Sequence, residues 1–136
     1  MADITWKYVS PLKDESELEA LELKYCYKLP EDLKTCIIEN NAGTPSLVTF
    51  DMGENKRMVF GGLLSFNKDD MDSIYDFICL FETDGGKKLK MFPFGIDPAG
   101  NFLCIKEGNI VFYNHEEDRS IFICKTFTDF LNMLYK

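Results

Sequence analysis

The sequence has few of the residues on which metal binding and redox chemistry usually depend. It contains one histidine and five cysteines, and no two cysteines stand in a C-x-x-C arrangement. Neither a zinc site nor a redox motif is predicted, because both need closely spaced ligands or thiols. The odd number and wide spacing of the cysteines favour free thiols in a reducing compartment over a disulfide framework.

Long apolar runs and positive charge are equally scarce. No run approaches the ~18 apolar residues of a membrane span, and residues 1–10 lack the charged start and apolar core of a signal peptide. The net charge of −8 opposes binding to nucleic-acid phosphates or to an anionic membrane. We therefore expect a cytoplasmic protein without nucleic-acid or membrane partners. Its acidic character either serves solubility alone or attracts a basic partner.

The chain has enough apolar residues, 46% of 136, to bury a core without disulfides. No internal repeat or low-complexity linker divides it, so we expect a single domain over residues 1–136. Helices are predicted after Asp14 or Ser16, after Pro30, over residues 68–81 and after Thr126. Strands are predicted over residues 46–51, 57–66, 89–94, 102–106, 109–113 and 120–124. This order indicates an α+β fold, with about four helices packed on a largely antiparallel or mixed sheet of about six strands.

Residues 92–117 are the most informative stretch. Asp97-Pro98-Ala99-Gly100 matches a type I turn, and a hairpin is expected around Glu107-Gly108. With a two-residue loop, both faces of the hairpin are apolar, which predicts a position in the middle of the sheet with both sides covered. The predicted cross-strand pairs are Phe102 with Tyr113, Leu103 with Phe112, Cys104 with Val111 and Ile105 with Ile110.

Glycine and asparagine mark two further positions. Asn40, Asn41 and Gly43 are expected to supply left-handed residues where the second helix ends. Gly61-Gly62, inside a strand-like run, predicts a bulge or a close backbone approach. A phosphate-binding loop is excluded there, because no helix start with lysine and serine or threonine follows.

Residues 68–84 form the most acidic part of the chain. They include six acidic residues and one lysine, a local net charge of −5. On the predicted helix, Asp69, Asp72 and Asp76 share one face, while Met71 belongs to the buried stripe. The helix dipole accounts for Asp69 and Asp72, but Asp76 lies beyond the first turn and repels Asp72. This face is a candidate contact surface for a basic partner, and a solvated surface is the alternative.

His115 lies beside Glu116 and Glu117, after the hairpin. A histidine among carboxylates can act as a general base, or it can hydrogen-bond a turn at the end of a strand. Catalysis normally needs a nucleophile or a second titrating group at a defined distance. No such motif accompanies His115 in the sequence.

Several short motifs, taken in order, resemble the SUKH superfamily of Smi/Knr-type domains. The resemblance covers about residues 14–136, and the Gly61-Gly62 step has no counterpart in the family pattern. The matching segments are Leu29-Pro30-Glu31-Asp32, Asn40-Asn41-Ala42-Gly43, Leu64-Ser65-Phe66, Pro93-Phe94-Gly95 with Asp97 and Gly100-Asn101, His115-Glu116, and Thr126-Phe127-Thr128-Asp129-Phe130-Leu131.

The resemblance implies a non-enzymatic binding protein with neither cofactor nor metal. Bacterial members typically bind and neutralise a secreted toxin domain, often a nuclease, whereas fungal relatives are regulatory hubs in cell-wall signalling. We expect an immunity protein that binds a basic cognate toxin through an acidic surface. The alternatives are a regulatory module that binds an endogenous protein, and a small hydrolase that uses His115. The expected partner-binding residues are Asp69, Asp72, Asp76, Asp97, His115, Glu116 and Glu117.

Overall fold

An antiparallel sheet of five strands forms the centre of the fold. The structure is a computed structural model that describes residues 4–136. The strands follow the order β11-β10-β9-β8-β5, and each neighbouring pair is antiparallel. The strands are β5 (Gly62–Leu63), β8 (Phe92–Ile96), β9 (Phe102–Lys106), β10 (Asn109–Asn114) and β11 (Arg119–Cys124).

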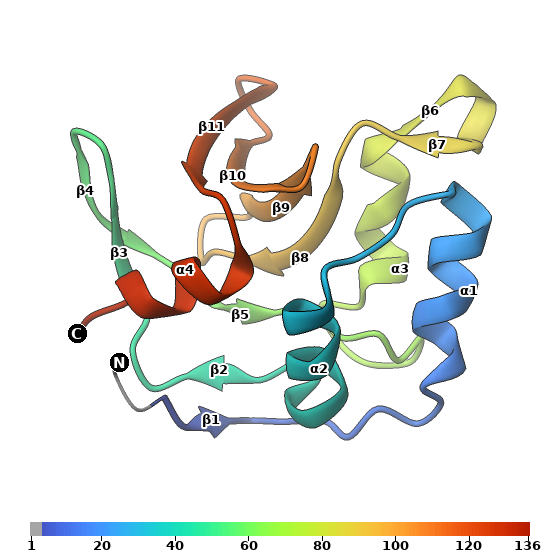
Figure 1. The fold of residues 1–136 in the computed structure, drawn as a ribbon, viewed down its shortest axis with the longest axis horizontal. Helices are drawn as coiled ribbons and strands as arrows, with labels where there is room; N and C mark the ends of the chain where they lie inside the picture. Colours follow the sequence, from blue (N-terminus) through green and yellow to red (C-terminus); the bar gives the residue numbers. More distant parts are fainter. Residues whose placement is uncertain (1–3) are drawn as a thin grey trace.

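Three two-stranded ribbons and four α-helices surround this sheet (Figure 1). The ribbons are β1 (Trp6–Lys7) with β2 (Thr44–Pro45), β3 (Thr49–Met52) with β4 (Asn55–Val59), and β6 (Glu82–Thr83) with β7 (Lys88–Leu89). The helices are α1 (Ser16–Tyr25), α2 (Glu31–Asn40), α3 (Ile74–Phe77) and α4 (Phe127–Met133). Figure 1 shows α1 beside α3 at one end of the molecule and α4 beside β3 at the other. The predicted α+β class is confirmed.

The β9–β10 hairpin has the predicted register. All four expected pairs are present, from Phe102 with Tyr113 to Ile105 with Ile110. The turn residues Glu107 and Gly108 both have positive φ, 51° and 83°, as a type I′ turn requires. The apolar residues of both strands are buried on both faces. The hairpin therefore lies inside the sheet, between β8 and β11.

Phenylalanine rings fill the space between the sheet and α4. Phe60 and Phe130 are fully buried and meet edge to face, with ring centroids 5.2 Å apart. Phe127 meets Phe94 in the same way at 5.5 Å, and such pairs add about 0.5–1.5 kcal/mol beyond burial. Gly95 makes room for this packing, since a Cβ there would lie 2.5 Å from the Phe60 ring. The predicted closing helix is confirmed as α4.

The strand predicted over residues 57–66 is wrong as a single element. It divides into β4 and β5, because Phe60 turns into the core and Gly61 follows. A Cβ on Gly61 would lie 2.8 Å from the carbonyl oxygen of Ile96, and Gly62 has a φ of 146°. The close backbone approach predicted at this step is therefore confirmed.

The prediction that Asn40, Asn41 and Gly43 supply left-handed residues after α2 is wrong. Ala42 has the positive φ, 65°, whereas Asn41 has a φ of −47°. Gly43 is needed for space instead: a Cβ there would lie 2.8 Å from the carbonyl oxygen of Asn40. The side chain of Asn41 is buried and hydrogen-bonds to Ser10, Ser65 and Phe66.

The helix predicted over residues 68–81 is wrong in its first half. Residues 67–72 form turns, α3 begins only at Ile74, and a 3₁₀ helix continues over Ile78–Phe81. Ser73 is the N-cap and accepts a hydrogen bond from the backbone N–H of Tyr75, so Asn67 does not cap this helix. A parallel bridge between Ser65 and Ser73 holds residues 67–72 as a closed loop.

Candidate partner-binding surface

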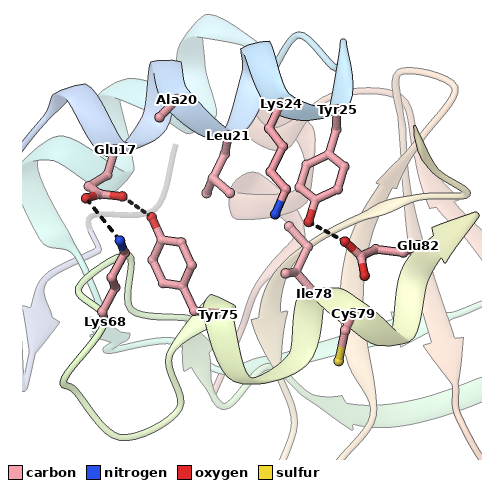
Figure 2. Close-up of a pocket in the computed structure, with 10 residues that line it drawn as sticks. All are labelled: Glu17, Ala20, Leu21, Lys24, Tyr25, Lys68, Tyr75, Ile78, Cys79 and Glu82. Carbon is pink, nitrogen blue, oxygen red and sulfur yellow. Dashed lines mark hydrogen bonds and ion pairs between the residues drawn. The ribbon is translucent and has the colours of Figure 1, made fainter. Parts of the chain in front are cut away.

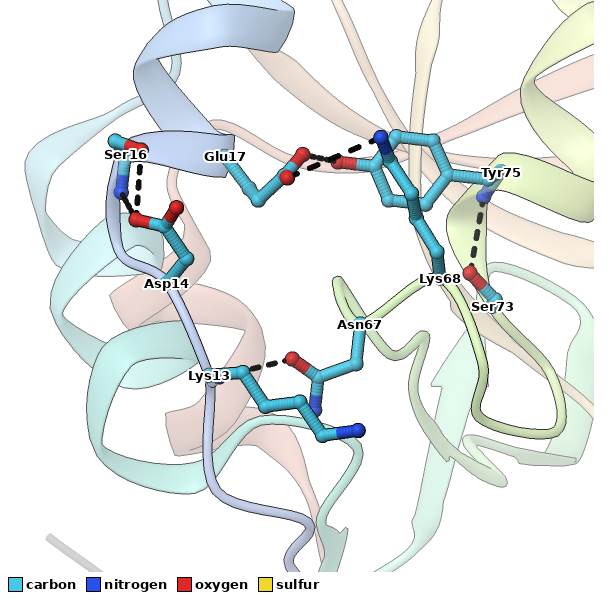
Figure 3. Close-up of polar contacts among 8 residues, drawn as sticks. All are labelled: Lys13, Asp14, Ser16, Glu17, Asn67, Lys68, Ser73 and Tyr75. Atoms are coloured by element: carbon cyan, nitrogen blue, oxygen red, sulfur yellow. Dashed lines mark hydrogen bonds and ion pairs between the residues drawn. The ribbon is translucent and has the colours of Figure 1, made fainter.

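The loop that replaces the first half of the predicted helix is held by its polar side chains. We call residues 67–76 the acidic segment. The amide group of Asn67 donates to the carbonyl oxygen of Pro11 at 3.0 Å. Its oxygen accepts from the N–H of Lys13 at 2.9 Å (Figure 3). Asp70 accepts from the hydroxyl of Ser65 at 2.6 Å and from the Asn67 amide at 3.0 Å. These bonds attach the acidic segment to the chain that precedes α1.

The acidic residues of this segment have two different roles. Asp70 is half-buried, and hydrogen bonds from Ser65, Ser10 and Asn67 lower its pKa. Asp69, Asp72 and Asp76 are exposed, and their carboxylates form no hydrogen bond or salt bridge with any residue of 4–136. They do not share a helix face as expected, since Asp72 has a φ of 52° and lies in the loop.

Met71 is exposed, contrary to the prediction from the helical periodicity. It was expected in the buried stripe, but 89% of its surface is exposed. It lies between Asp69 and Asp72 in the sequence, so an exposed apolar side chain belongs to the same loop as two exposed aspartates. The cluster of Asn67 with Asp69 and Asp70 is typical of a turn, and this signal could have located the loop in the sequence.

α1 and the part of the chain from the acidic segment to β6 enclose a cleft of about 430 Å³ (Figure 2). Two tyrosine–glutamate hydrogen bonds close its ends. Tyr75 of α3 donates to Glu17 of α1, and Tyr25 of α1 donates to Glu82 of β6 at 2.7 Å. Lys68 pairs with Glu17 at 4.0 Å.

The hydroxyls in the cleft are hydrogen-bond donors and not nucleophiles at neutral pH. Burial, followed by the bond to Glu82, raises the pKa of Tyr25 to about 12. Burial and the bond to Glu17 raise the pKa of Tyr75 well above its usual range. Both groups therefore stay protonated. The Tyr75 hydroxyl links α3 to α1, and the Tyr25 hydroxyl links α1 to β6.

The central turn and the exit from the hairpin come together through Asn101. Asp97 accepts hydrogen bonds from the N–H groups of Ala99 and Asn101, at 2.9 and 2.7 Å, which shape the predicted turn. The side-chain oxygen of Asn101 accepts the backbone N–H of His115 at 3.3 Å. The structure thus places Asp97 and His115 on neighbouring loops, although their side chains are not in contact through any hydrogen bond among residues 4–136.

The loop between β10 and β11 presents the other expected contact residues. His115, Glu116 and Glu117 are exposed, and the backbone N–H groups of both glutamates bond to the side chain of Asn114. Asp118, at the end of this loop, is instead engaged by Tyr113 at 2.6 Å and by Lys90 at 3.2 Å. The candidate residues therefore lie on two parts of the chain, the acidic segment and the loops that carry Asp97 and His115, and no hydrogen bond among residues 4–136 links the two.

Within residues 4–136, no group of three or more histidine, cysteine, aspartate or glutamate side chains could hold a metal ion. The imidazole of His115 forms no hydrogen bond with residues of that range. In the same part of the chain, no helix is long and apolar enough to cross a membrane.

The sequence matches the model of the SMI1 / KNR4 family (SUKH-1) over residues 13–133. The chain belongs to the SMI1 / KNR4 family. A search of curated proteins found no match. The family match covers α1 to α4, and so includes the acidic segment, the central turn and the loop after β10.

Proposed function

We propose that this SMI1 / KNR4-family protein is a single-domain, non-enzymatic immunity protein that binds and neutralises a cognate bacterial toxin. The observation that carries the proposal is that Met71 is exposed in the same segment as Asp69, Asp72 and Asp76, whose exposed carboxylates have no hydrogen-bond or salt-bridge partner among residues 4–136. Methionine is enriched at protein interfaces, where an apolar centre is surrounded by a polar rim. Family membership supports a binding role, as bacterial relatives of this type neutralise toxins.

The charge of the surface indicates the chemistry of the partner. Unpaired carboxylates attract a basic surface and speed its association, most strongly at low salt. A nuclease toxin presents such a surface, because it must bind nucleic-acid phosphates. Glu116 and Glu117, with Asp97 and His115 beside them, form the second acidic surface of the proposal. Carboxylates from either surface would occupy the positions of the phosphates and block access to the toxin.

The test is co-expression with the product of the neighbouring reading frame, scored by growth and by affinity capture. The triple variant Asp69→Lys, Asp72→Lys, Asp76→Lys should slow association at low salt by at least tenfold and abolish growth rescue. The matched control changes three exposed glutamates elsewhere by the same charge: Glu19→Lys, Glu39→Lys and Glu54→Lys. This control variant should bind the neighbouring gene product more strongly than the triple aspartate variant does.

Two results would contradict this proposal in different ways. Unchanged binding after charge reversal of both acidic surfaces, with Glu116→Lys and Glu117→Lys added, would exclude electrostatic recognition. Capture of the neighbouring product without growth rescue would favour a regulatory interaction module over an immunity protein. Met71→Ala separates the apolar contribution: we expect faster dissociation with little change in the salt dependence of association.

A further inference from the structure

One face of α1 forms a wall of the cleft of about 430 Å³ (Figure 2). The helix positions that line it, 17, 20, 21 and 24, recur at spacings of three and four, which places them on the same side of the helix. Leu21 of α1 and Ile78 across the cleft are buried and give it an apolar interior. Small-molecule sites have volumes of ~300–1,000 Å³, mostly apolar walls and a few polar groups that fix the ligand. The cleft has the size and the lining of such a site.

Both carboxylates of the cleft already have partners. Glu17 accepts a hydrogen bond from the hydroxyl of Tyr75 and lies 4.0 Å from the ammonium of Lys68. Glu82 accepts a hydrogen bond from the hydroxyl of Tyr25 at 2.7 Å. A cationic ligand would have to displace one of these partners.

Lys24 is the charged side chain of the cleft that lacks a partner. It forms no hydrogen bond or salt bridge with any residue of 4–136. Its ammonium lies 5.1 Å from the centre of the Tyr25 ring and points into the cleft (Figure 2). The lining contains two lysines and two glutamates, so it has no net charge, in a protein whose net charge is −8. An anion therefore meets less repulsion here than over the acidic segment.

We propose that the cleft binds a small apolar molecule that carries one carboxylate, a function distinct from toxin binding. The carboxylate pairs with the ammonium of Lys24 in a charge-assisted hydrogen bond. The apolar part of the ligand lies against Leu21 and Ile78 and removes their remaining surface from water. A second negative charge would lie near Glu17 or Glu82 without a cation of its own, so dicarboxylates and phosphates fit less well.

Titration with hydrocinnamate and with its uncharged analogue hydrocinnamamide, followed by amide NMR shifts, tests the proposal. We expect saturable shifts in α1 and at Ile78, with a dissociation constant for hydrocinnamate in the millimolar range or below, as suits a ligand of this size. The uncharged analogue should bind at least tenfold more weakly, because it cannot form the charge-assisted bond. No saturable shift at these positions would overturn the proposal, as would equal affinity for the two probes.

Removing the charge of Lys24 separates the polar contact from the apolar one. Lys24→Met should weaken hydrocinnamate binding at least tenfold and leave the affinity for hydrocinnamamide unchanged. Lys28→Met is the matched control, since Lys28 is exposed, follows α1 and does not line this cleft. The control should bind both probes like the parent. An equal loss in the two variants would show a general effect of charge and overturn the assignment to Lys24.

Filling the cleft tests the place of binding. Ala20 is exposed and lines the cleft, so Ala20→Trp should occupy the ligand's space and abolish the shifts with both probes. Leu23→Trp is the control on the same helix, because Leu23 is 80% exposed and lies outside this lining. Hydrocinnamate binding that survives Ala20→Trp would overturn the proposal. If Ala20→Trp does not fold, the comparison of Lys24→Met with Lys28→Met still decides.

Discussion

Asn41 is the residue at which three parts of the chain are joined by buried hydrogen bonds. Its side-chain oxygen accepts the N–H of Phe66 at 2.8 Å, and its amide donates to the carbonyl oxygen of Ser10 and to the hydroxyl of Ser65. The side chain is 1% exposed, so no water replaces these partners. The end of α2, the chain before α1 and the start of the acidic segment therefore depend on one amide group.

Replacing Asn41 should weaken the fold much more than replacing its neighbour. Asn41→Ala leaves the buried N–H of Phe66 without an acceptor, which should lower the free energy of unfolding by about 1–3 kcal/mol. Asn40→Ala is the control, since the one side-chain hydrogen bond of Asn40 among residues 4–136 is a weak one to the sulfur of Cys36, at 3.9 Å. We expect a change within about 0.5 kcal/mol for the control in urea denaturation. Equal losses would contradict the proposed role of Asn41.

Asp70 should make the stability of the acidic segment dependent on pH. Hydrogen bonds from Ser65 and other groups hold its pKa below the ordinary value. A lowered pKa stabilises the folded state above the unfolded pKa of ~3.9, and this stabilisation is lost as the pH falls through the folded pKa. The difference in unfolding free energy between the parent and Asp70→Asn should be constant near neutral pH and shrink below pH ~4. A difference that persists unchanged at low pH would refute this assignment.

Among the elements, those defined by local chemistry were predicted well. The β9–β10 hairpin follows from its own residues: Glu107-Gly108 accepts positive φ, and the flanking strands fix which side chains oppose each other. The first half of the third helix was mispredicted because distant groups decide it. Asn67 bonds to Pro11 and Lys13, more than 50 residues away, and these bonds replace helical ones.

In the candidate site, too, features set by neighbouring residues could be predicted, and features set by distant contacts could not. The turn at Asp97 and the exposure of Glu116 and Glu117 follow from adjacent residues, so the sequence could indicate them. The exposure of Met71 was not predicted, because the helical spacing of the apolar residues outweighed the turn signal of Asn67, Asp69 and Asp70. The link from Asn101 to His115 was also missed, since it depends on how two loops meet after the sheet has formed.

The two tyrosine–glutamate bonds should hold α1 in place. Tyr25→Phe and Tyr75→Phe each remove a hydroxyl that bonds to a carboxylate, which should lower the free energy of unfolding by about 1.5–3 kcal/mol. Hydrogen exchange should accelerate more in α1 than in β9 and β10, because these two bonds join α1 only to the opposite side of the cleft. Tyr8→Phe is the control, as its side chain is 82% exposed and its hydroxyl bonds to no residue of 4–136. Uniform acceleration throughout the sheet would contradict a local role.

At the scale of the whole molecule, negative charge is poorly compensated. The chain has 23 acidic and 15 basic side chains, yet only five salt bridges connect residues of the described range 4–136. Four of these five involve at least one side chain more than 60% exposed, where ion pairs stabilise little. Repulsion between the remaining acids therefore opposes the compact state.

Added salt should consequently stabilise this protein. Raising NaCl from ~10 to ~150 mM shortens the screening length from about 30 to about 8 Å, which weakens repulsion between distant surface acids. We expect the thermal midpoint to rise over this range. A variant with Glu19→Gln, Glu39→Gln and Glu54→Gln should start from a higher midpoint and gain less from salt, because part of the repulsion is already removed. A midpoint that falls as NaCl is added would show that attractive pairs outweigh the excess of negative charge, and would weaken the electrostatic basis of the proposed toxin binding.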